Sequence, residues 1–265
     1  MANSSPDDNS DIVPDCGLEL MEPTEYQTMY QVEDHHWWYV GMQRITTTQI
    51  TVLFPGRSDL SILDAGCGTG AVMKYLAPFG NVTGFDLMPH ALNFCQERGL
   101  ARLVQASVTR VPFAPDHFDL ATSFDVLCHR SIGDYREALR EFNRVLKPGG
   151  YLFLRLPAYN WLRGHHDQVV HTVHRFSRAE IKAALVETGF TAVKLSYANM
   201  LLFPLALGKR MAERFVPEND GASDVRPNPP WQDNLFARFL YAEAGWLRHS
   251  ALPFGLTLMA IGRKV

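Results

Sequence analysis

The sequence predicts an α/β fold, in which a mostly parallel sheet is covered by helices on both faces. Two observations carry this prediction. From residue 59 onward, short apolar runs alternate with longer amphipathic segments, a pattern typical of parallel strands joined by helices. The first apolar run also ends in a glycine-rich turn, in the stretch "SILDAGCGTG" over 61–70. Glycine costs conformational entropy unless the backbone uses its freedom.

The expected elements follow one another along the chain. Apolar runs predict strands at 60–65, 81–87, 101–107, 118–124, 151–158, 191–198 and 255–265. Helices are expected at 70–79, 89–99, 133–150 and 177–190. Pro89 and Gly99 suit the two ends of one helix, and Ser177 with Gly189 suit those of another.

The chain divides into a core and three additions. Its 265 residues, 46% of them apolar, are enough for one substantial core. We expect a disordered tail over 1–20, aromatic-rich helices over 21–58, a core over 59–198 and 254–265, and a helical insertion over 199–253. The "NPPW" stretch over 228–231 lies in this insertion, where we expect a turn-rich loop.

Composition excludes several classes of protein. A net charge of −3 with mixed acids and bases provides no basic field for nucleic acid. The four cysteines have no paired spacing, so we expect no disulfide framework and a cytoplasmic location. The polar, acidic N-terminus is unlike a signal peptide, and no run reaches the roughly 18 apolar residues of a membrane span. A peripheral membrane contact and a homodimer stay open.

The glycine-rich turn predicts a ligand site. A strand, a glycine turn and a helix N-terminus together form a binding crevice at the carboxyl end of a parallel sheet. The glycines at 66, 68 and 70 are one residue more closely spaced than the dinucleotide fingerprint G-x-G-x-x-G. This spacing argues against a nicotinamide-dependent dehydrogenase.

The stretch "LDAGCGTG" closely resembles the first motif of class I S-adenosylmethionine-dependent methyltransferases, and of the type 11-like subgroup with small-molecule acceptors. Asp86 in "VTGFDL", the turn "VLKPGGYLFL" and the helix "FSRAEIKAALVETGF" match further family segments in order. The resemblance implies a Rossmann-like seven-stranded sheet of order 3-2-1-4-5-7-6, with the last strand antiparallel. It also implies methyl transfer, with S-adenosylmethionine as donor and S-adenosylhomocysteine as product.

The resemblance also assigns residues to the donor. The amino-acid end would meet the loop, the ribose hydroxyls would meet Asp86, and the adenine would meet apolar side chains. Ser107 stands where the family usually has an acid, and Cys67 is interpreted as a small loop residue rather than a nucleophile. The segment "HHWWYVGMQR" resembles a lid helix, whose aromatics could face the sulfonium cation and whose arginine could pair with the donor carboxylate. The assigned residues are Asp64, Gly66, Cys67, Gly68, Asp86, Leu87, Met88, Ser107, Phe124, Trp38 and Arg44.

The acceptor side is expected in the histidine-rich segment over 156–177, after the fifth strand. Its candidate catalytic residues are His166, Asp167 and His171, with His165 and His174 nearby. Three roles stay open for this segment: ordering the loop by hydrogen bonds, acting as a general base, or binding a metal. No metal site is assigned. His129 also matches a family position, where histidine often shapes the site.

These observations predict methyl transfer to an O, N or C atom of a small, apolar molecule. Two alternatives remain: a non-catalytic protein that binds S-adenosylmethionine, and an NAD-dependent dehydrogenase. The apolar residues of the insertion could line the acceptor pocket, form a dimer surface, touch a membrane or pack as core.

Overall fold

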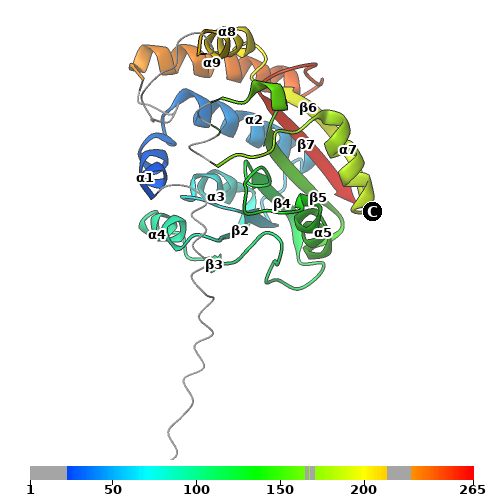
Figure 1. The fold of residues 1–265 in the computed structure, drawn as a ribbon. Coiled ribbons are helices and arrows are strands. Elements are labelled where there is room, and N and C mark those ends of the chain that lie inside the picture. Colours follow the sequence, from blue (N-terminus) through cyan, green and yellow to red (C-terminus); the bar gives the residue numbers. More distant parts are fainter. Residues whose placement is uncertain (1–22, 165–166, 168–170, 214–227) are drawn as a thin grey trace, which may run out of the picture.

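The computed structural model describes residues 23–164, 167, 171–213 and 228–265, so the predicted disordered tail over 1–20 lies outside the described residues. Seven strands form one sheet in the order β3-β2-β1-β4-β5-β7-β6, as predicted. Figure 1 shows this sheet with helices around it. The strands are β1 Leu60–Ala65, β2 Gly80–Asp86, β3 Leu103–Gln105, β4 Phe118–Phe124, β5 Leu146–Pro157, β6 Phe190–Ala198 and β7 Thr257–Lys264.

The sheet is parallel except at its last strand. β1 pairs in parallel with both β2 and β4, with Ile62 opposite Val82 and Leu120. β7 runs antiparallel between β5 and β6, which confirms the predicted orientation. The carboxyl ends of β1, β2, β4 and β5 therefore meet at one edge of the sheet, where this fold binds ligands.

Helices occupy the segments between the strands. They are α1 Pro23–Val32, α2 Trp37–Leu53, α3 Ala71–Leu76, α4 Pro89–Glu97, α5 Tyr135–Val145, α7 Arg178–Glu187, α8 Phe203–Glu213 and α9 Pro230–Leu247, with short 3₁₀ turns η1 Ala77–Phe79 and η2 Asn160–Leu162. The predicted cap of α7 is present as a reciprocal capping box between Ser177 and Glu180.

Some predicted boundaries were wrong. The helix expected to reach residue 150 ends at Val145, and Leu146 already has an extended conformation. Pro148 explains this early end, because proline cannot donate to the helix and disfavours a helical residue before it. Pro230 and Trp231 of "NPPW", expected in a loop, begin α9.

Two apolar layers enclose the sheet. One face packs Phe85, Leu152 and Leu154 against Phe142 of α5 and Ile181 of α7. The other face packs its side chains against α2 and α9; its members include Ile45, Ile62, Phe153, Leu240, Leu247 and Ile261. α7 and α9 therefore lie on opposite faces of the sheet.

The insertion and the N-terminal helices support each other on that second face. A Cβ atom at Gly41 of α2 would lie 2.1 Å from Leu240 Cδ1 of α9, so the two helices approach closely only because residue 41 is glycine. Gln49 Nε2 donates to the Leu247 carbonyl at 3.1 Å, and Trp37 N donates to Asp233 Oδ1 at 3.2 Å. α9 therefore fixes the position of α2.

Glu243 of α9 is fully buried and joins the insertion to the end of β6. Its two carboxylate oxygens accept from Asn199 N at 2.7 Å and from Leu201 N at 2.8 Å. Asn199 has a left-handed φ of 61°, and these bonds hold the chain where it turns toward α8.

We predict that Glu243→Ala lowers the free energy of unfolding by about 2–3 kcal/mol, because two buried backbone donors lose a charged acceptor. Urea denaturation monitored by circular dichroism measures this loss. The exposed Glu97→Ala on α4 is the control, and it should change stability by less than about 0.5 kcal/mol. Equal effects of the two variants would contradict the structural role of Glu243.

Candidate active site

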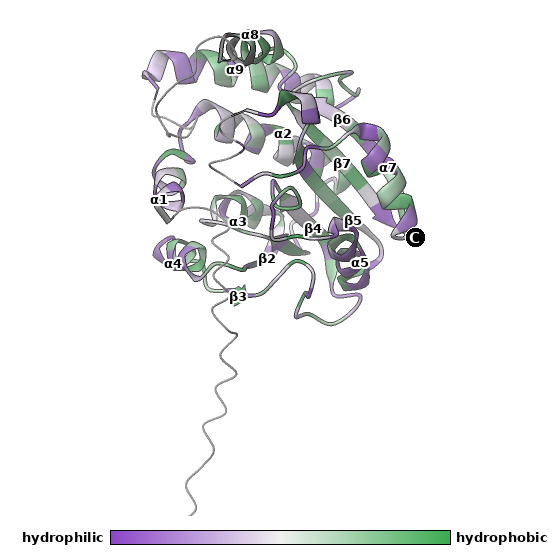
Figure 2. Ribbon diagram, in the orientation of Figure 1, coloured by the Kyte–Doolittle hydropathy of each residue, from purple (hydrophilic) through white to green (hydrophobic). Residues whose placement is uncertain are grey.

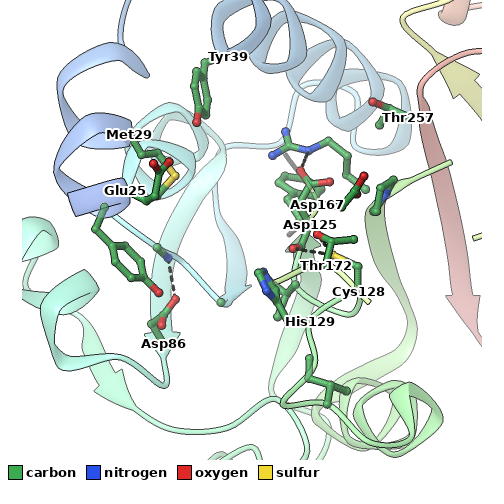
Figure 3. Close-up of a pocket in the computed structure, with 18 of the residues that line it drawn as sticks. Glu25, Met29, Tyr39, Asp86, Asp125, Cys128, His129, Asp167, Thr172 and Thr257 are labelled. Carbon is green, nitrogen blue, oxygen red and sulfur yellow. Dashed lines mark hydrogen bonds and ion pairs between the residues drawn. The ribbon is translucent and has the colours of Figure 1, made fainter. Parts of the chain in front are cut away.

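A cavity of about 490 Å³ lies at the carboxyl edge of the sheet, beneath α1 and α2. Figure 3 shows Asp86 on one wall, with Asp125, Cys128, His129, Asp167 and Thr172 on the opposite wall. This volume suits a small organic ligand.

The glycine loop forms one end of the cavity. Gly66 N and Cys67 N donate to the Phe85 carbonyl at 2.9 and 3.0 Å, which joins the loop to the end of β2. Gly66 and Gly68 have φ values of 77° and 53°, a region that favours glycine. A Cβ atom at Gly66 would lie 2.3 Å from Val126 Cγ2, so a side chain there would collide with the opposite wall.

Asp86 is buried beside this loop and lines the cavity. Its Oδ2 accepts from Gly68 N and its Oδ1 from Met88 N, both at 2.9 Å. Burial raises the pKa of Asp86, and the two backbone donors oppose that shift. Each oxygen keeps a free lone pair, so the carboxylate can accept from two neighbouring hydroxyl groups.

Asp64, at the end of β1, lies behind the loop and is almost fully buried. Its Oδ1 accepts from Thr122 Oγ1 at 2.8 Å, whereas its Oδ2 has no hydrogen-bond partner among the residues that the structure describes. Burial raises the pKa of Asp64 to about 7. A buried acceptor without a partner is costly, so this position fits a ligand cation or N–H donor.

The two tryptophans of the predicted lid segment pack against different elements. Trp37 packs edge-on against Phe236 of α9, with ring centroids 5.4 Å apart. Trp38 packs against Arg155, whose guanidinium lies 4.9 Å from the Trp38 ring and 4.7 Å from the Phe124 ring. Both tryptophans line the cavity.

Arg155, which sequence reasoning missed, is buried at the end of β5 and donates to Asp125 Oδ2 at 2.7 Å. Arg44, predicted to pair with the donor, is instead exposed and does not line the cavity. Six residues separate Arg44 from Trp38, which is about 240° around a helix, so the two side chains leave α2 on different sides. Arg155 is the arginine that lines the cavity beside Trp38.

Sequence reasoning also missed the contact that holds α1 over the glycine loop. The buried Glu33 accepts from Arg98 Nη2 at 2.6 Å and from the Thr69 hydroxyl. Arg98 Nε donates to the Thr69 carbonyl at 2.9 Å, and its guanidinium lies 4.5 Å from the Tyr30 ring. The acid in "EDHHWW" was visible in the sequence, but its partner lies 65 residues away on the far side of the loop.

The remaining donor candidates differ in their placement. Leu87, Ser107 and Phe124 line the cavity, whereas Cys67 and Met88 do not. The Cys67 thiol faces Cys95, with the sulfurs 3.9 Å apart. Hydrogen bonding to Cys95 and burial raise the pKa of the Cys67 thiol, so it stays protonated and is not a nucleophile.

Asp167 lines the acceptor side and is fully engaged by Arg175. Arg175 Nε donates to Oδ1 at 2.9 Å and Nη2 donates to Oδ2 at 3.0 Å, a bidentate pair. Gly164 N also donates to Oδ2 at 2.8 Å, and Arg175 Nη1 donates to the Ala158 carbonyl at 3.1 Å. These contacts favour the role of ordering the loop for Asp167.

The histidines of this segment are spread out. His174 Nε2 lies 2.7 Å from Glu180 Oε1 and its ring packs on Phe176, outside the cavity lining. His171 has a left-handed φ of 51° and does not line the cavity, although its neighbour Thr172 does. His165 and His166 lie outside the described residues. Across the parts of the chain that are described, no three His, Cys, Asp or Glu side chains are grouped as metal ligands.

The electrostatics of the cavity suit a cation. Asp125 and Asp167 neutralise the two arginines of its lining, Arg155 and Arg175. Within the described parts of the chain, Asp86 accepts hydrogen bonds from the backbone N–H groups of Gly68 and Met88, and Asp64 lies just behind the loop. The surplus charge at the glycine end is therefore negative.

Comparisons with known proteins agree with this geometry. Residues 63–154 match a family model described as a methyltransferase domain. Malonyl-[acyl-carrier protein] O-methyltransferase of Salmonella typhimurium is 35% identical over 122 residues, which cover 45% of this chain and 46% of that protein. Demethylmenaquinone methyltransferase of Staphylococcus aureus is 38% identical over 102 residues, covering 36% and 42%. The chain spans less than half the length of these curated relatives.

Solved structures share the fold. A methyltransferase from Thermotoga maritima, titled a possible histamine N-methyltransferase, matches with a TM-score of 0.57 at 16% identity, over 91% of this chain and 95% of that one. An S-adenosylmethionine-dependent methyltransferase from Mesorhizobium loti gives 0.55 at 18% identity, over 88% and 100%. Residues 63–154 of the chain therefore match a methyltransferase domain, in agreement with the class predicted from the sequence.

We predict that donor affinity rises with pH between about 5 and 7. An ionised Asp64 would pair with the donor's ammonium group and a protonated one would not, and the pKa of about 7 means that the ionised fraction grows over this range; the gain can reach about tenfold per pH unit. Isothermal titration calorimetry with S-adenosylmethionine measures this rise. Asp64→Asn should abolish it, and the exposed Asp59→Asn should retain it.

The stability of the free protein should change in the opposite direction. Burial raises the pKa of Asp64 in the folded state above the ordinary aspartate value of 3.8. The folded state therefore holds this proton more tightly, and Asp64 destabilises it increasingly as pH rises from about 4 to 7. The melting temperature of Asp64→Asn relative to that of the wild type should therefore increase over this range. A constant difference would contradict the raised pKa.

Proposed function

We propose that this protein transfers the methyl group of S-adenosylmethionine to an O, N or C atom of a small acceptor with an apolar body. The observation that carries the proposal is the buried, unpartnered Asp64 Oδ2 beside a glycine loop whose Gly68 N–H group already orients Asp86. A ligand with an ammonium group and a ribose diol would satisfy both carboxylates at once.

The residues of the cavity fit this donor. Asp64 and the backbone of Gly66 and Gly68 would hold the amino-acid end, and Asp86 would accept from the ribose hydroxyls. Leu87 and the segment around Ser107 would pack on the adenine; the Ser107 hydroxyl already lies 2.9 Å from the Thr109 hydroxyl. When bound, S-adenosylmethionine supplies a methyl group activated on a sulfonium. Trp38 and Phe124 offer aromatic faces near that cation.

The acceptor would occupy the wall formed by the later part of the chain. Its apolar lining includes Leu162, Ala206 and Leu256, whereas His129, Thr172 and Thr257 provide polar groups there. The named relatives act on a malonyl-acyl-carrier protein and on demethylmenaquinone, which supports an acceptor that combines a polar reacting atom with an apolar part. The match to the family model ends at residue 154, before most of the residues of this wall, so the choice between O, N and C rests on this chain's own wall.

The chain's contribution to the chemistry is mainly positioning. In-line placement of the nucleophile against an activated methyl supplies much of the acceleration, so a dedicated base is optional. Asp167, held by Arg175 and Gly164, would order the acceptor wall rather than take a proton. His166 and His171 stay candidate bases for an acceptor hydroxyl or ammonium group.

Two alternatives compete with this proposal. The protein could bind the donor without catalysis, and one structural relative with a TM-score of 0.52 is titled a [4+2]-cyclase, so the fold does not by itself define the reaction. A nicotinamide dehydrogenase would need the longer glycine spacing, which this loop lacks. Donor binding, cofactor choice and turnover separate the three.

We predict micromolar binding of S-adenosylmethionine and no binding of NADH in titration calorimetry. Asp86→Ala should weaken donor binding at least about a hundredfold, because two charge-assisted hydrogen bonds to the ribose are lost. The exposed Asp59→Ala should bind like the wild type. Binding of NADH in place of S-adenosylmethionine would overturn the proposal, and donor binding without transfer to any acceptor would favour the non-catalytic alternative.

We also predict that Asp167→Asn and Arg175→Met lower kcat/KM by similar factors and leave the shape of the pH profile unchanged. Both variants break the same buried pair, and removing one member leaves the other charge uncompensated. Steady-state kinetics between pH 5 and 9 test this. Loss of the acidic limb in Asp167→Asn alone would assign Asp167 as a general base instead.

A further inference from the structure

The outer face of α9 is apolar, although no other element within the described residues covers it. Four of its exposed large side chains lie on this face, namely Trp231 at 67%, Leu235 at 42%, Phe239 at 37% and Trp246 at 55%, whereas the exposed Tyr241 lies to one side of it. In the view of Figure 2, α8 and α9 form the upper edge of the molecule and carry hydrophobic residues along their length. Large apolar side chains gathered on one exposed helix usually mark a contact surface.

These side chains form one stripe. At about 100° per residue, positions 231, 235, 239, 242 and 246 fall within an arc of about 80°. The buried side chains of α9, Ala237, Leu240, Ala244 and Leu247, lie on the opposite side and pack into the core. α9 is therefore apolar on two faces, and only one of them is used by the fold.

The acidic side chains of α9 point toward the core, and its basic side chains are exposed. Its two acids are turned inward: Glu243 accepts from backbone groups at the start of α8, and Asp233 accepts from Trp37 N and Asn228 Nδ2. Arg238 on the stripe and Arg248 at the C-cap are exposed. The outward surface thus combines tryptophans with positive charge, a composition that complements an anionic lipid surface.

A second copy of this chain fits the stripe less well. Arg238 lies at the midpoint of α9, which runs from Pro230 to Leu247. A two-fold contact between antiparallel α9 helices would place Arg238 against its own copy. The acids of α9 are already engaged in the fold, so none remains on the stripe to neutralise that pair.

We propose that the protein docks on anionic membranes through the α9 stripe, with the helix lying in the interfacial plane. Among the helices of the described residues, none is long and apolar enough to cross a membrane, which suits a helix that lies on the surface. The segment before α8 contacts α9 at Glu243 and exposes Leu201 at 43%, and α8 itself exposes Leu205 at 61% and lines the cavity with Ala206. On the proposed function, this places the acceptor wall next to the lipid.

The test is flotation of the full chain with vesicles of phosphatidylglycerol and phosphatidylcholine, compared with vesicles of phosphatidylcholine alone. The wild type should float with the anionic vesicles, and this binding should fall as salt is raised. Trp231→Ser combined with Trp246→Ser should lower the partition coefficient at least about tenfold, since the interfacial side chains are lost. Arg238→Glu should lower it on anionic vesicles.

Two matched variants lie on α7, on the opposite face of the sheet. Val186→Ser removes a side chain exposed at 63%, and Lys182→Glu makes the same charge change as Arg238→Glu. Both should float like the wild type. No flotation of the wild type, equal loss in the α7 variants, or a dimer that the double tryptophan variant dissociates in analytical ultracentrifugation would each overturn the proposal. Donor binding, measured separately by calorimetry, does not depend on α9 reaching a membrane.

Discussion

The hydrogen bonds between the glycine loop and the end of β2 are the contact on which the candidate site depends. Gly66 N and Cys67 N bond to the Phe85 carbonyl, and Gly68 N bonds to Asp86. These bonds require left-handed backbone at Gly66 and Gly68, and the missing side chain at Gly66 leaves room for Val126. One short loop therefore sets the orientation of Asp86 and the width of the cavity, and it separates the cavity from the buried Asp64.

The elements that enclose the cavity lie far from the glycine loop in the sequence. Glu33 and Arg98 join α1 to the loop and to α4, and α2 is supported from behind by α9. The insertion therefore supports the lid, because α9 fixes the position of α2 and α2 carries Trp38. Its second, outward face is the feature that the fold itself does not use.

Buried charge is arranged differently at the two ends of the cavity. At the acceptor end, Asp125 with Arg155 and Asp167 with Arg175 are neutral pairs, which position the wall without adding net charge. At the donor end, Asp64 and Asp86 are buried, and no cationic side chain among the described residues is bonded to either of them. An uncompensated buried carboxylate is costly, and a bound cation would relieve that cost, which links the stability of the protein to donor binding.

The sequence by itself determined the alternation of strands and helices, the glycine loop and the cap at Ser177, because each depends on local pattern or on a motif a few residues long, whereas the strand order followed from the family resemblance. Helix ends were less certain, as the early end of α5 before Pro148 shows. Only the tertiary structure decided which arginines line the cavity: Arg155 and Arg175, rather than Arg44. It also decided the partners of Glu33 and Glu243, which lie 65 and 44 residues away. A buried charge must find its partner in space, and that partner depends on how distant elements pack, which no local pattern records.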